Sequence, residues 1–276
     1  MTSNSNLKLN PKRNSSFKIE MSERRRVETY QGPTIEGTKF ESLTNINLNY
    51  SWDDIKIDGS YKAHVHFDSV QQLFVDKVDM HQSNELNSPD EIYQKGLKAF
   101  SGASFLLNIE DFGHNISFDG YDQFRHKFDL IYTETPSINK SDLNLFFGRE
   151  YFMHIFKKIF SILPDTPLSI GSSWTREEPI AISDPATITV TYNLVEIKNN
   201  IIIIKTTFKG RSYISSYGKE MQMAGSGEGI IELDAATGDL IKSKNSITTV
   251  GNTNIGGINI QMKIFNDNEI KSTRIQ

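Results

Sequence analysis

The sequence predicts a mainly β protein, in which two related antiparallel meanders form curved sheets or an open half-barrel. Three observations carry this prediction. Alternating, β-branched or aromatic segments recur along the chain between Gly, Asn and Asp punctuation. Two parts of the sequence repeat the same order of strand and turn residues. Between them, one long amphipathic segment predicts a helix across the concave side of the sheets.

Nine segments carry the strand signal. They are residues 17–30, 38–55, 60–70, 105–109, 115–118, 187–198, 201–209, 229–233 and 240–250. The four isoleucines from Ile201 to Ile204 directly follow Asn199 and Asn200, a pair typical of a tight turn. Because this run is too short to span a membrane, we expect a buried strand after a turn.

The two halves of the chain match in character at several positions. The matching segments are, in pairs, 49–56 and 191–198, 61–67 and 202–208, and 108–116 and 232–241. Alternation and glycine turns are generic, so the alternative is that any two β-hairpins look alike. Shared Tyr, Ile-Lys and Phe positions in the same order favour a duplication, with two similar units packed side by side or facing each other.

A short helix is predicted near residues 89–100. Ser88 is the expected cap, Pro89 takes the first helical position, and Glu91 follows Ser88 by three residues, which is typical of a capping box.

A second, longer helix is predicted from about Ser141 to Leu163, where Pro164 ends it. Its apolar stripe consists of Phe152, Ile155, Phe156, Ile159 and Leu163. A stripe of this kind has to be buried against another part of the protein.

These elements divide the chain into four segments. They are a polar N-terminal tail (1–14), a first β unit (15–135), a connecting helix (136–170) and a second β unit (171–276). A length of 276 residues is also compatible with one continuous domain over 15–276.

The charge pattern argues against a nucleic-acid partner. The net charge of −4 creates no overall field that would attract a phosphate backbone. The basic triplet Arg24, Arg25 and Arg26 lies in an alternating segment between Glu23 and Glu28. We interpret it as a solvated strand face.

Several classes of site are excluded by composition. The chain has no cysteine, which excludes disulfides, thiolate metal sites, iron–sulfur clusters and cysteine nucleophiles. No stretch of 18 apolar residues predicts a transmembrane segment, and residues 1–14 contain no apolar core of a signal peptide. The chain is therefore expected to be soluble.

The segment from Leu163 to Trp174, LPDTPLSIGSSW, resembles the "LP…P…vGdsW" signature of DUF6263, a Bacteroidetes family of unknown function. Residues 7–30 and the glycine turns at Gly113 and Gly238 are similar to further segments of that family, so the resemblance spans almost the whole chain. It implies an envelope-associated, mostly β protein, related in style to open-barrel lipoprotein carriers. It therefore implies a periplasmic or cell-surface location. Family members usually start with a secretion or lipoprotein signal, which this sequence lacks, so a cytoplasmic location stays open.

His64 and His66 are weak candidates for metal ligands. They flank Val65 in a predicted strand, so both side chains point to the same face. A metal site needs a third ligand, and no other residue has a fixed relation to this pair. We favour exposed histidines on a solvated strand and predict no metal.

The glycine-rich segment from Gly225 to Gly229 does not predict a phosphate-binding loop. It lacks the Gly-Lys-Ser/Thr ending, and no helix signal follows it. A glycine-rich start of a strand or a bulge explains it better.

The acidic residues near the glycine turns favour turn capping over acid–base chemistry. They are Glu110, Asp111, Asp119, Asp234 and Asp239. Asp side chains at such positions cap their own backbone. Because the sequence also contains no catalytic motif, we predict no enzyme and no cofactor.

The function expected from these features is non-catalytic binding of a hydrophobic or lipid-like small molecule in the cell envelope. An apolar pocket between the helix and the sheet would be lined by Phe152, Ile155, Phe156, Ile159 and Trp174. The alternative is a structural or interaction module that binds another envelope protein through a sheet face or edge. A filled concavity and an exposed apolar patch elsewhere would favour that alternative.

Overall fold

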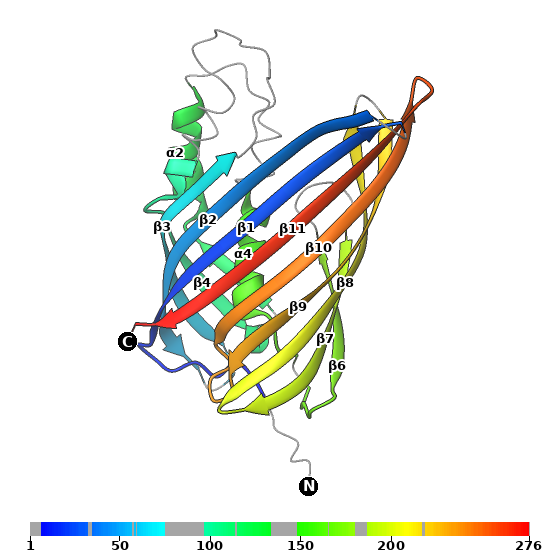
Figure 1. Cartoon of the computed structure of the whole chain (residues 1–276). Helices are drawn as coiled ribbons and strands as arrows, with labels where there is room; N and C mark the ends of the chain where they lie inside the picture. The colour runs from blue at the N-terminus through cyan, green and yellow to red at the C-terminus, as the bar shows by residue number, and fades with distance from the viewer. Residues whose placement is uncertain are drawn as a thin grey trace.

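Eleven antiparallel strands form one open sheet in the computed structural model of the chain (Figure 1). The structure describes residues 7–32, 35–56, 58, 60–74, 97–113, 115–133, 148–164, 166–179, 187–216 and 219–275. The strands are β1 (Ser16–Gln31), β2 (Ile35–Ile55), β3 (Tyr61–Phe74), β4 (Ser104–Glu110), β5 (Asn115–Asp119), β6 (Ser173–Pro179), β7 (Thr187–Lys198), β8 (Ile201–Ser216), β9 (Lys219–Asp234), β10 (Leu240–Ile255) and β11 (Ile258–Arg274).

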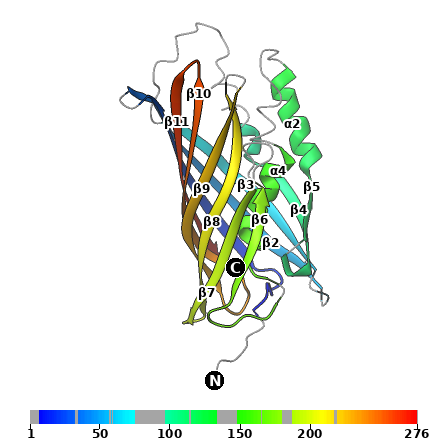
Figure 2. The ribbon, with the colours of Figure 1, turned by 90° about the vertical axis from the view of Figure 1, so that its right-hand side faces the viewer.

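The first and last strands meet at the centre of this sheet. The strand order is β5-β4-β3-β2-β1-β11-β10-β9-β8-β7-β6, and β1 pairs with β11 from Phe17 opposite Arg274 to Gln31 opposite Ile260. Each half of the chain is therefore a simple meander, and β5 and β6 are the two outer edges. The sheet curls, so that its two edges lie on the same side of the molecule (Figure 2).

Two α-helices and one short 3-10 helix accompany the sheet in the described part of the chain. They are α2 (Tyr121–Thr133), α4 (Arg149–Phe160) and η1 (Asp111–Gly113), and residues 97–100 are helical as well. Figure 2 shows α4 on the concave side, between the arm formed by β3, β4 and β5 and the arm formed by β6, β7 and β8.

The helix predictions need correction. The helix predicted from Ser141 to Leu163 is described only over residues 149–160, while 141–147 lie outside the described residues. It ends at Phe160 rather than Leu163, because Ser161 leaves the helical conformation and the next carbonyls turn towards β6. Of the helix predicted near 89–100, only residues 97–100 are described, and they are helical. The sequence did not predict α2.

All nine predicted strand segments coincide with strands, although the segment 60–70 begins one residue before β3. The predicted bounds of β7 are those observed, and Asn199 and Asn200 form the predicted turn with φ values of 53° and 63°. Two strands were missed, β6 and β11. The prediction for β9 was too short, because the glycine-rich segment that we placed at the start of a strand lies inside β9, which begins at Lys219.

Alternation along the strands separates a buried concave face from a more exposed convex face. Along β2, for example, Leu48, Tyr50 and Trp52 are buried, whereas the residues between them are partly exposed. The buried concave residues, α4 and α2 form one continuous hydrophobic cluster, which we call the main core.

Candidate functional site

The space between α4 and the sheet is filled by side chains. Phe152 on α4 has no exposed surface, and its ring stacks on Phe100 at a centroid distance of 4.8 Å. The rings of Phe105 and Phe124 lie 4.7 and 4.9 Å from it. Contacts at these distances are those of a packed aromatic interior. The region under α4 is therefore core rather than an open pocket.

The helix is fixed to both edges of the sheet. At its start, Arg149 donates a hydrogen bond of 2.8 Å to the carbonyl oxygen of Phe118 on β5, and its guanidinium lies 4.5 Å from the ring centroid of that residue. Beyond its end, Arg176 on β6 donates to the carbonyl oxygens of Ser161 and Leu163, the latter at 2.6 Å. The segment that contains α4 therefore bridges the two open edges β5 and β6.

The predicted ligand-binding residues lie in or beside this packed region. Phe152, Ile155, Phe156 and Ile159 are all buried and come together in the main core. Trp174 is partly buried, stacks on Tyr192 at 5.3 Å, and donates a 3.2 Å hydrogen bond to the carbonyl oxygen of Ile162. Their role in ligand binding stays a prediction, and any ligand there would have to displace side chains.

The concave face continues beyond α4 as a surface that we call the distal face. It is formed by the parts of β1, β2 and β8–β11 that lie beyond Met21, towards the Gln31 end of β1. Side chains directly opposite each other on antiparallel strands point to the same face, so the strand register defines rows across this surface. Two successive rows are Ser42, Arg25, Asn266, Ile247, Gly227 and Phe208, and then Phe40, Val27, Ile264, Thr249, Gly225, Gly210 and Ile188.

A polar band separates the main core from a second apolar cluster on the distal face. The band comprises Glu23, Arg25, Thr44, Asn245, Asn266 and Asn268. The second cluster, which we call the distal cluster, contains buried Met221, Met223 and Ile264 with partly buried Val27, Ile260 and Met262. The same concave face thus carries apolar, polar and again apolar side chains along its length.

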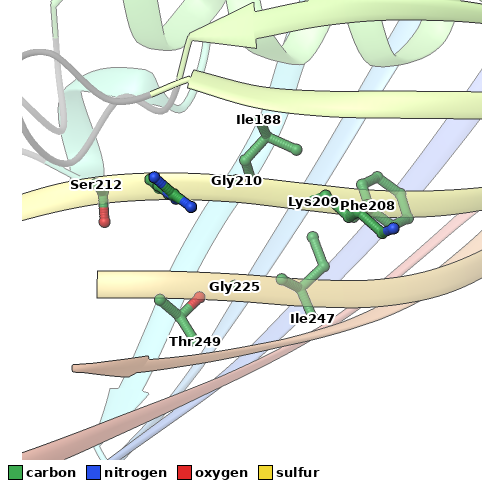
Figure 3. A pocket seen from close by; sticks show the side chains of 9 residues that line it. Ile188, Phe208, Lys209, Gly210, Ser212, Gly225, Ile247 and Thr249 are labelled. Atoms are coloured by element: carbon green, nitrogen blue, oxygen red, sulfur yellow. The ribbon is translucent and has the colours of Figure 1, made fainter. Parts of the chain in front are cut away.

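A small hollow lies on the distal face beside Ile188 and Phe208, which pack against the main core (Figure 3). It is lined by Ile188, Phe208, Lys209, Gly210, Arg211, Ser212, Gly225, Ile247 and Thr249. The hollow measures about 240 Å³, but this volume includes the part that is open to solvent, and the enclosed part is much smaller. As it stands, the hollow therefore holds little more than one water molecule.

Glycines shape this part of the sheet. A Cβ atom on Gly227 would lie 2.2 Å from the carbonyl oxygen of Ser246 and 2.8 Å from the Cα atom of Ile247, both on the neighbouring strand β10. Glycine permits this close approach of β9 to β10. The glycine-rich segment thus has a structural explanation, and its three glycines leave the concave face without side chains beside the hollow.

A buried carboxylate lies at the other end of the concave face. Asp239 accepts a 3.1 Å hydrogen bond from Trp52 Nε1, and the hydroxyl of Tyr50 lies 3.4 Å from the same oxygen. Burial raises the pKa of Asp239 above its usual value, although hydrogen bonds from Thr237, Trp52 and Tyr50 oppose this shift. Burial and the nearby carboxylate also raise the pKa of Tyr50 well above its usual value. This contact ties β2 to the turn between β9 and β10.

Asp234 has a structural role, and the two histidine candidates lie on the surface of the sheet. Asp234 caps its own turn by accepting hydrogen bonds from the backbone of Ala236 and Thr237 at 2.8 and 3.0 Å, as predicted. His64 and His66 lie on the convex face with more than half of each side chain exposed. Among the described residues, no group of three His, Cys, Asp or Glu side chains could hold a metal ion.

Two functional candidates were missed by sequence reasoning. Asp239 was interpreted as a turn residue, but it accepts hydrogen bonds inside the protein. Arg25 was interpreted as part of a solvated face, but the register places it on the concave side, opposite Asn266 and Ser42. The alternation of the Arg24–Arg26 triplet could have revealed that its middle member faces the other way.

The sequence profile of a family of unknown function, DUF6263, matches residues 45–240 of the chain. No curated protein matches it. Among solved structures, one described as "lipid-protein interactions in lipovitellin" is similar over 95% of this chain and 26% of that chain, with 6% identity and a TM-score of 0.47. Ail of Yersinia pestis, in complex with the heparin analogue sucrose octasulfate, is similar over 93% of this chain and 99% of that chain, with 6% identity and a TM-score of 0.17.

At these scores neither likeness carries an argument about function. The chain spans only about a quarter of the lipovitellin chain that it matches. None of the described helices is both long and apolar enough to cross a membrane.

Proposed function

The chain belongs to DUF6263, a family of unknown function, and we propose from its geometry that it binds an amphipathic, lipid-like small molecule along the distal face. The observation that carries this proposal is the second apolar cluster on the concave face. It lies beyond the part filled by α4 and across a polar band from the main core. A surface that offers apolar and polar side chains in succession matches a ligand with the same two parts.

The composition of the distal cluster supports a site that adapts to its ligand. Three of its six residues are methionines, namely Met221, Met223 and Met262. Methionine side chains are unbranched and flexible, so they fill gaps and repack around other apolar groups. In this proposal, the methionines repack to make room for the ligand on the distal face beside the small hollow.

The dimensions of the distal face fit an alkyl chain of moderate length. From Arg25 to Gln31 the strand β1 advances six residues, which corresponds to about 20 Å at the usual rise of a strand. Val27 and Phe40 face each other at the beginning of this stretch, and 36% of the Phe40 surface is exposed. An alkyl chain of about ten carbons would cover apolar side chains such as Val27 and Phe40 along this part of the distal face.

The structure offers less support for an interaction module. The exposed large apolar residues on the convex side are spread over different strands among the described residues, with Leu73 on β3, Val195 on β7 and Ile230 on β9. Ile230 pairs with Lys205 on one side and Lys244 on the other. Single apolar residues among charged ones do not form the contiguous patch that a partner protein needs.

The predicted duplication stays part of the proposal. The matching segments 49–56 and 191–198 end β2 and β7, and each leads through a turn into the next strand of its meander. Tyr50 and Tyr192, which correspond to each other in this match, are both buried. Two repeats joined through β1 and β11 would explain how one concave face arose from two halves. A periplasmic or cell-surface location remains a prediction from the family.

Binding of decan-1-ol and decanoate, measured by isothermal titration calorimetry, tests the proposed function. We expect saturable binding to the unmodified chain. Ile247→Gln should weaken binding about tenfold, because Ile247 is partly exposed and covering a large apolar side chain contributes about 1.5 kcal/mol. Thr248→Gln, on the same strand but on the convex face, is the matched control and should leave binding unchanged.

Two results would overturn the proposal. One is the absence of saturable binding of either ligand. The other is an equal loss of affinity in Ile247→Gln and Thr248→Gln while both variants keep the thermal stability of the unmodified chain.

A further inference from the structure

The three consecutive arginines of β1 lie on opposite faces of the sheet. Arg24 and Arg26 are on the convex face, where they form ion pairs with Glu41 at 2.6 Å and with Glu28 at 3.2 Å. The guanidinium of Arg26 also lies 4.2 Å from the ring centroid of Phe265. Successive side chains of a strand alternate, so Arg25 points to the concave side. The burial of its Nε atom agrees with this placement.

Arg25 has polar neighbours on both adjacent strands. It lies opposite Asn266 on β11 and opposite Ser42 on β2, which is buried with 3% exposure. The Oδ1 atom of Asn266 is buried and has no hydrogen-bond partner in the described part of the protein. A buried polar atom without a partner requires an explanation. A rotation of this amide by 180° would put its N–H donors in place of this acceptor.

The position of Arg25 relative to the distal cluster decides the sign of the charge expected on the ligand's polar end. Val27 and Ile264 form the next pair along β1 and β11, so Arg25 is the charge that directly borders the cluster. Glu23 also faces the concave side, but it lies one pair further towards the main core, opposite Asn268. A ligand whose alkyl chain covers Val27 and Ile264 therefore places its polar end at Arg25 before it reaches Glu23.

We propose that Arg25, with Asn266 and Ser42 beside it, binds an anionic head group of the ligand, a carboxylate or a phosphate. This inference rests on the proposed function and specifies the chemistry of its ligand. The guanidinium presents donors in a planar fork that fits either anion with two parallel hydrogen bonds. Its position next to apolar side chains, with the Nε atom buried, strengthens the attraction to an anion.

The test compares three ten-carbon ligands that differ in the head group: decanoate, decyl phosphate and decan-1-ol. We expect the unmodified chain to bind the preferred anion at least about tenfold more tightly than the alcohol, since a hydrogen bond to a charged group contributes about 1.5–3 kcal/mol. Arg25→Gln should abolish this preference and leave binding of decan-1-ol unchanged. Arg25→Lys, which keeps the charge, should retain part of the preference.

Arg24→Gln and Arg26→Gln are the matched controls, because they remove the same charge from the convex face of the same strand. Both should keep the full preference for the anion. The tighter of decanoate and decyl phosphate identifies the head group as a carboxylate or a phosphate.

The outcomes separate this inference from the proposed function. If decan-1-ol binds as tightly as both anions, or if Arg25→Gln keeps the preference, the head-group assignment is wrong and the proposed function survives. If the two convex controls lose the preference as Arg25→Gln does, the effect is one of net charge and the assignment is again wrong. If none of the three ligands binds, the proposed function itself fails.

Discussion

The hydrogen bond between Trp52 and Asp239 should contribute to stability in a way that depends on the charge of the carboxylate. Trp52 is 1% exposed and Asp239 is 4% exposed, so water cannot replace a missing donor easily. Trp52→Phe keeps an aromatic ring but removes the Nε1 donor, which lies 3.1 Å from the carboxylate oxygen. We therefore expect Trp52→Phe to lower the free energy of unfolding by more than the smaller size of the phenylalanine ring would alone.

The magnitude follows from the kind of hydrogen bond that is lost. A hydrogen bond to a charged group contributes about 1.5–3 kcal/mol, whereas one between neutral groups contributes about 0.5–1.5 kcal/mol. In the Asp239→Asn background the acceptor is neutral, so Trp52→Phe should cost about 1 kcal/mol less than in the unmodified chain. The cost of the smaller ring is the same in both backgrounds and cancels in this double-mutant cycle.

The effect of pH on the single substitution Asp239→Asn can be predicted in sign. The pKa of Asp239 is raised in the folded protein above the ordinary carboxyl value of 3.8, so the folded state holds this proton more tightly than the unfolded state. Its contribution to stability is therefore full at low pH and declines as the pH rises from about 3.8 through the raised folded pKa. Asparagine has no such decline, and the stability of Asp239→Asn relative to the unmodified chain should increase with pH.

Urea unfolding of the four chains of this cycle, followed by circular dichroism and by tryptophan fluorescence at pH 4 and pH 7, measures both effects, since Trp174 remains in all four chains. The reasoning would be refuted if Trp52→Phe had the same cost with and without Asp239, within about 0.5 kcal/mol, the usual limit of additivity. A relative stability of Asp239→Asn that falls as the pH rises would refute the assignment of the raised pKa.

Three further substitutions test other parts of the fold by urea unfolding. Phe152→Ala should cost about 3–5 kcal/mol, because its ring is fully buried among other aromatic rings; a cost below about 1 kcal/mol would contradict the packed interior. Gly227→Ala should cost about 1–3 kcal/mol because its Cβ meets the backbone of β10, whereas the exposed control Glu228→Ala should stay within about 0.5 kcal/mol. Arg176→Met should cost about 2 kcal/mol or more, because it removes the donors to two carbonyl oxygens after α4; an unchanged midpoint would show that this contact does not hold the helix.

The strands that the sequence predicted well are those with uniform alternation between clear turn residues. The strand β7 and the start of β8 are such a case, since Asn199 and Asn200 adopt the positive φ angles that this pair tolerates. The strand β11 was missed because its concave residues change from Ile260 and Met262 to Asn266 and Asn268. A polar band on the buried face breaks the pattern of alternation on which the prediction depends.

The helix α2 was missed although its sequence carries a signal. Phe124 and Phe128 are spaced four residues apart, Tyr121 precedes Phe124 by three, and both phenylalanines are buried in the main core. This spacing is typical of one helix face. In an aromatic-rich chain with many strand signals, such a short segment resembles a strand as much as a helix.

The sequence predicted the residue types of the candidate site and the side of the sheet where it lies, but not whether that side is filled. A buried phenylalanine stripe has the same sequence pattern whether it faces a ligand or other side chains, so Phe152 and Phe156 pointed to the concave side but could not show that it is filled. Similarly, alternation indicates that the side chains of Arg24 and Arg25 lie on different faces of the sheet, but it does not indicate which face is concave. Both questions depend on how the sheet curls, which is set by contacts between residues far apart in the sequence.

Photo-crosslinking of a ten-carbon fatty acid that carries a diazirine near the end of its alkyl chain tests the central claim most directly. If the distal face is the binding site, peptide mass spectrometry should locate the crosslinks on concave residues towards the Gln31 end of β1, such as Met223, Ile260 and Met262, and excess decanoate should suppress them. Crosslinks on the convex residues of the same strands, or on α4 at Phe152, would contradict the claim.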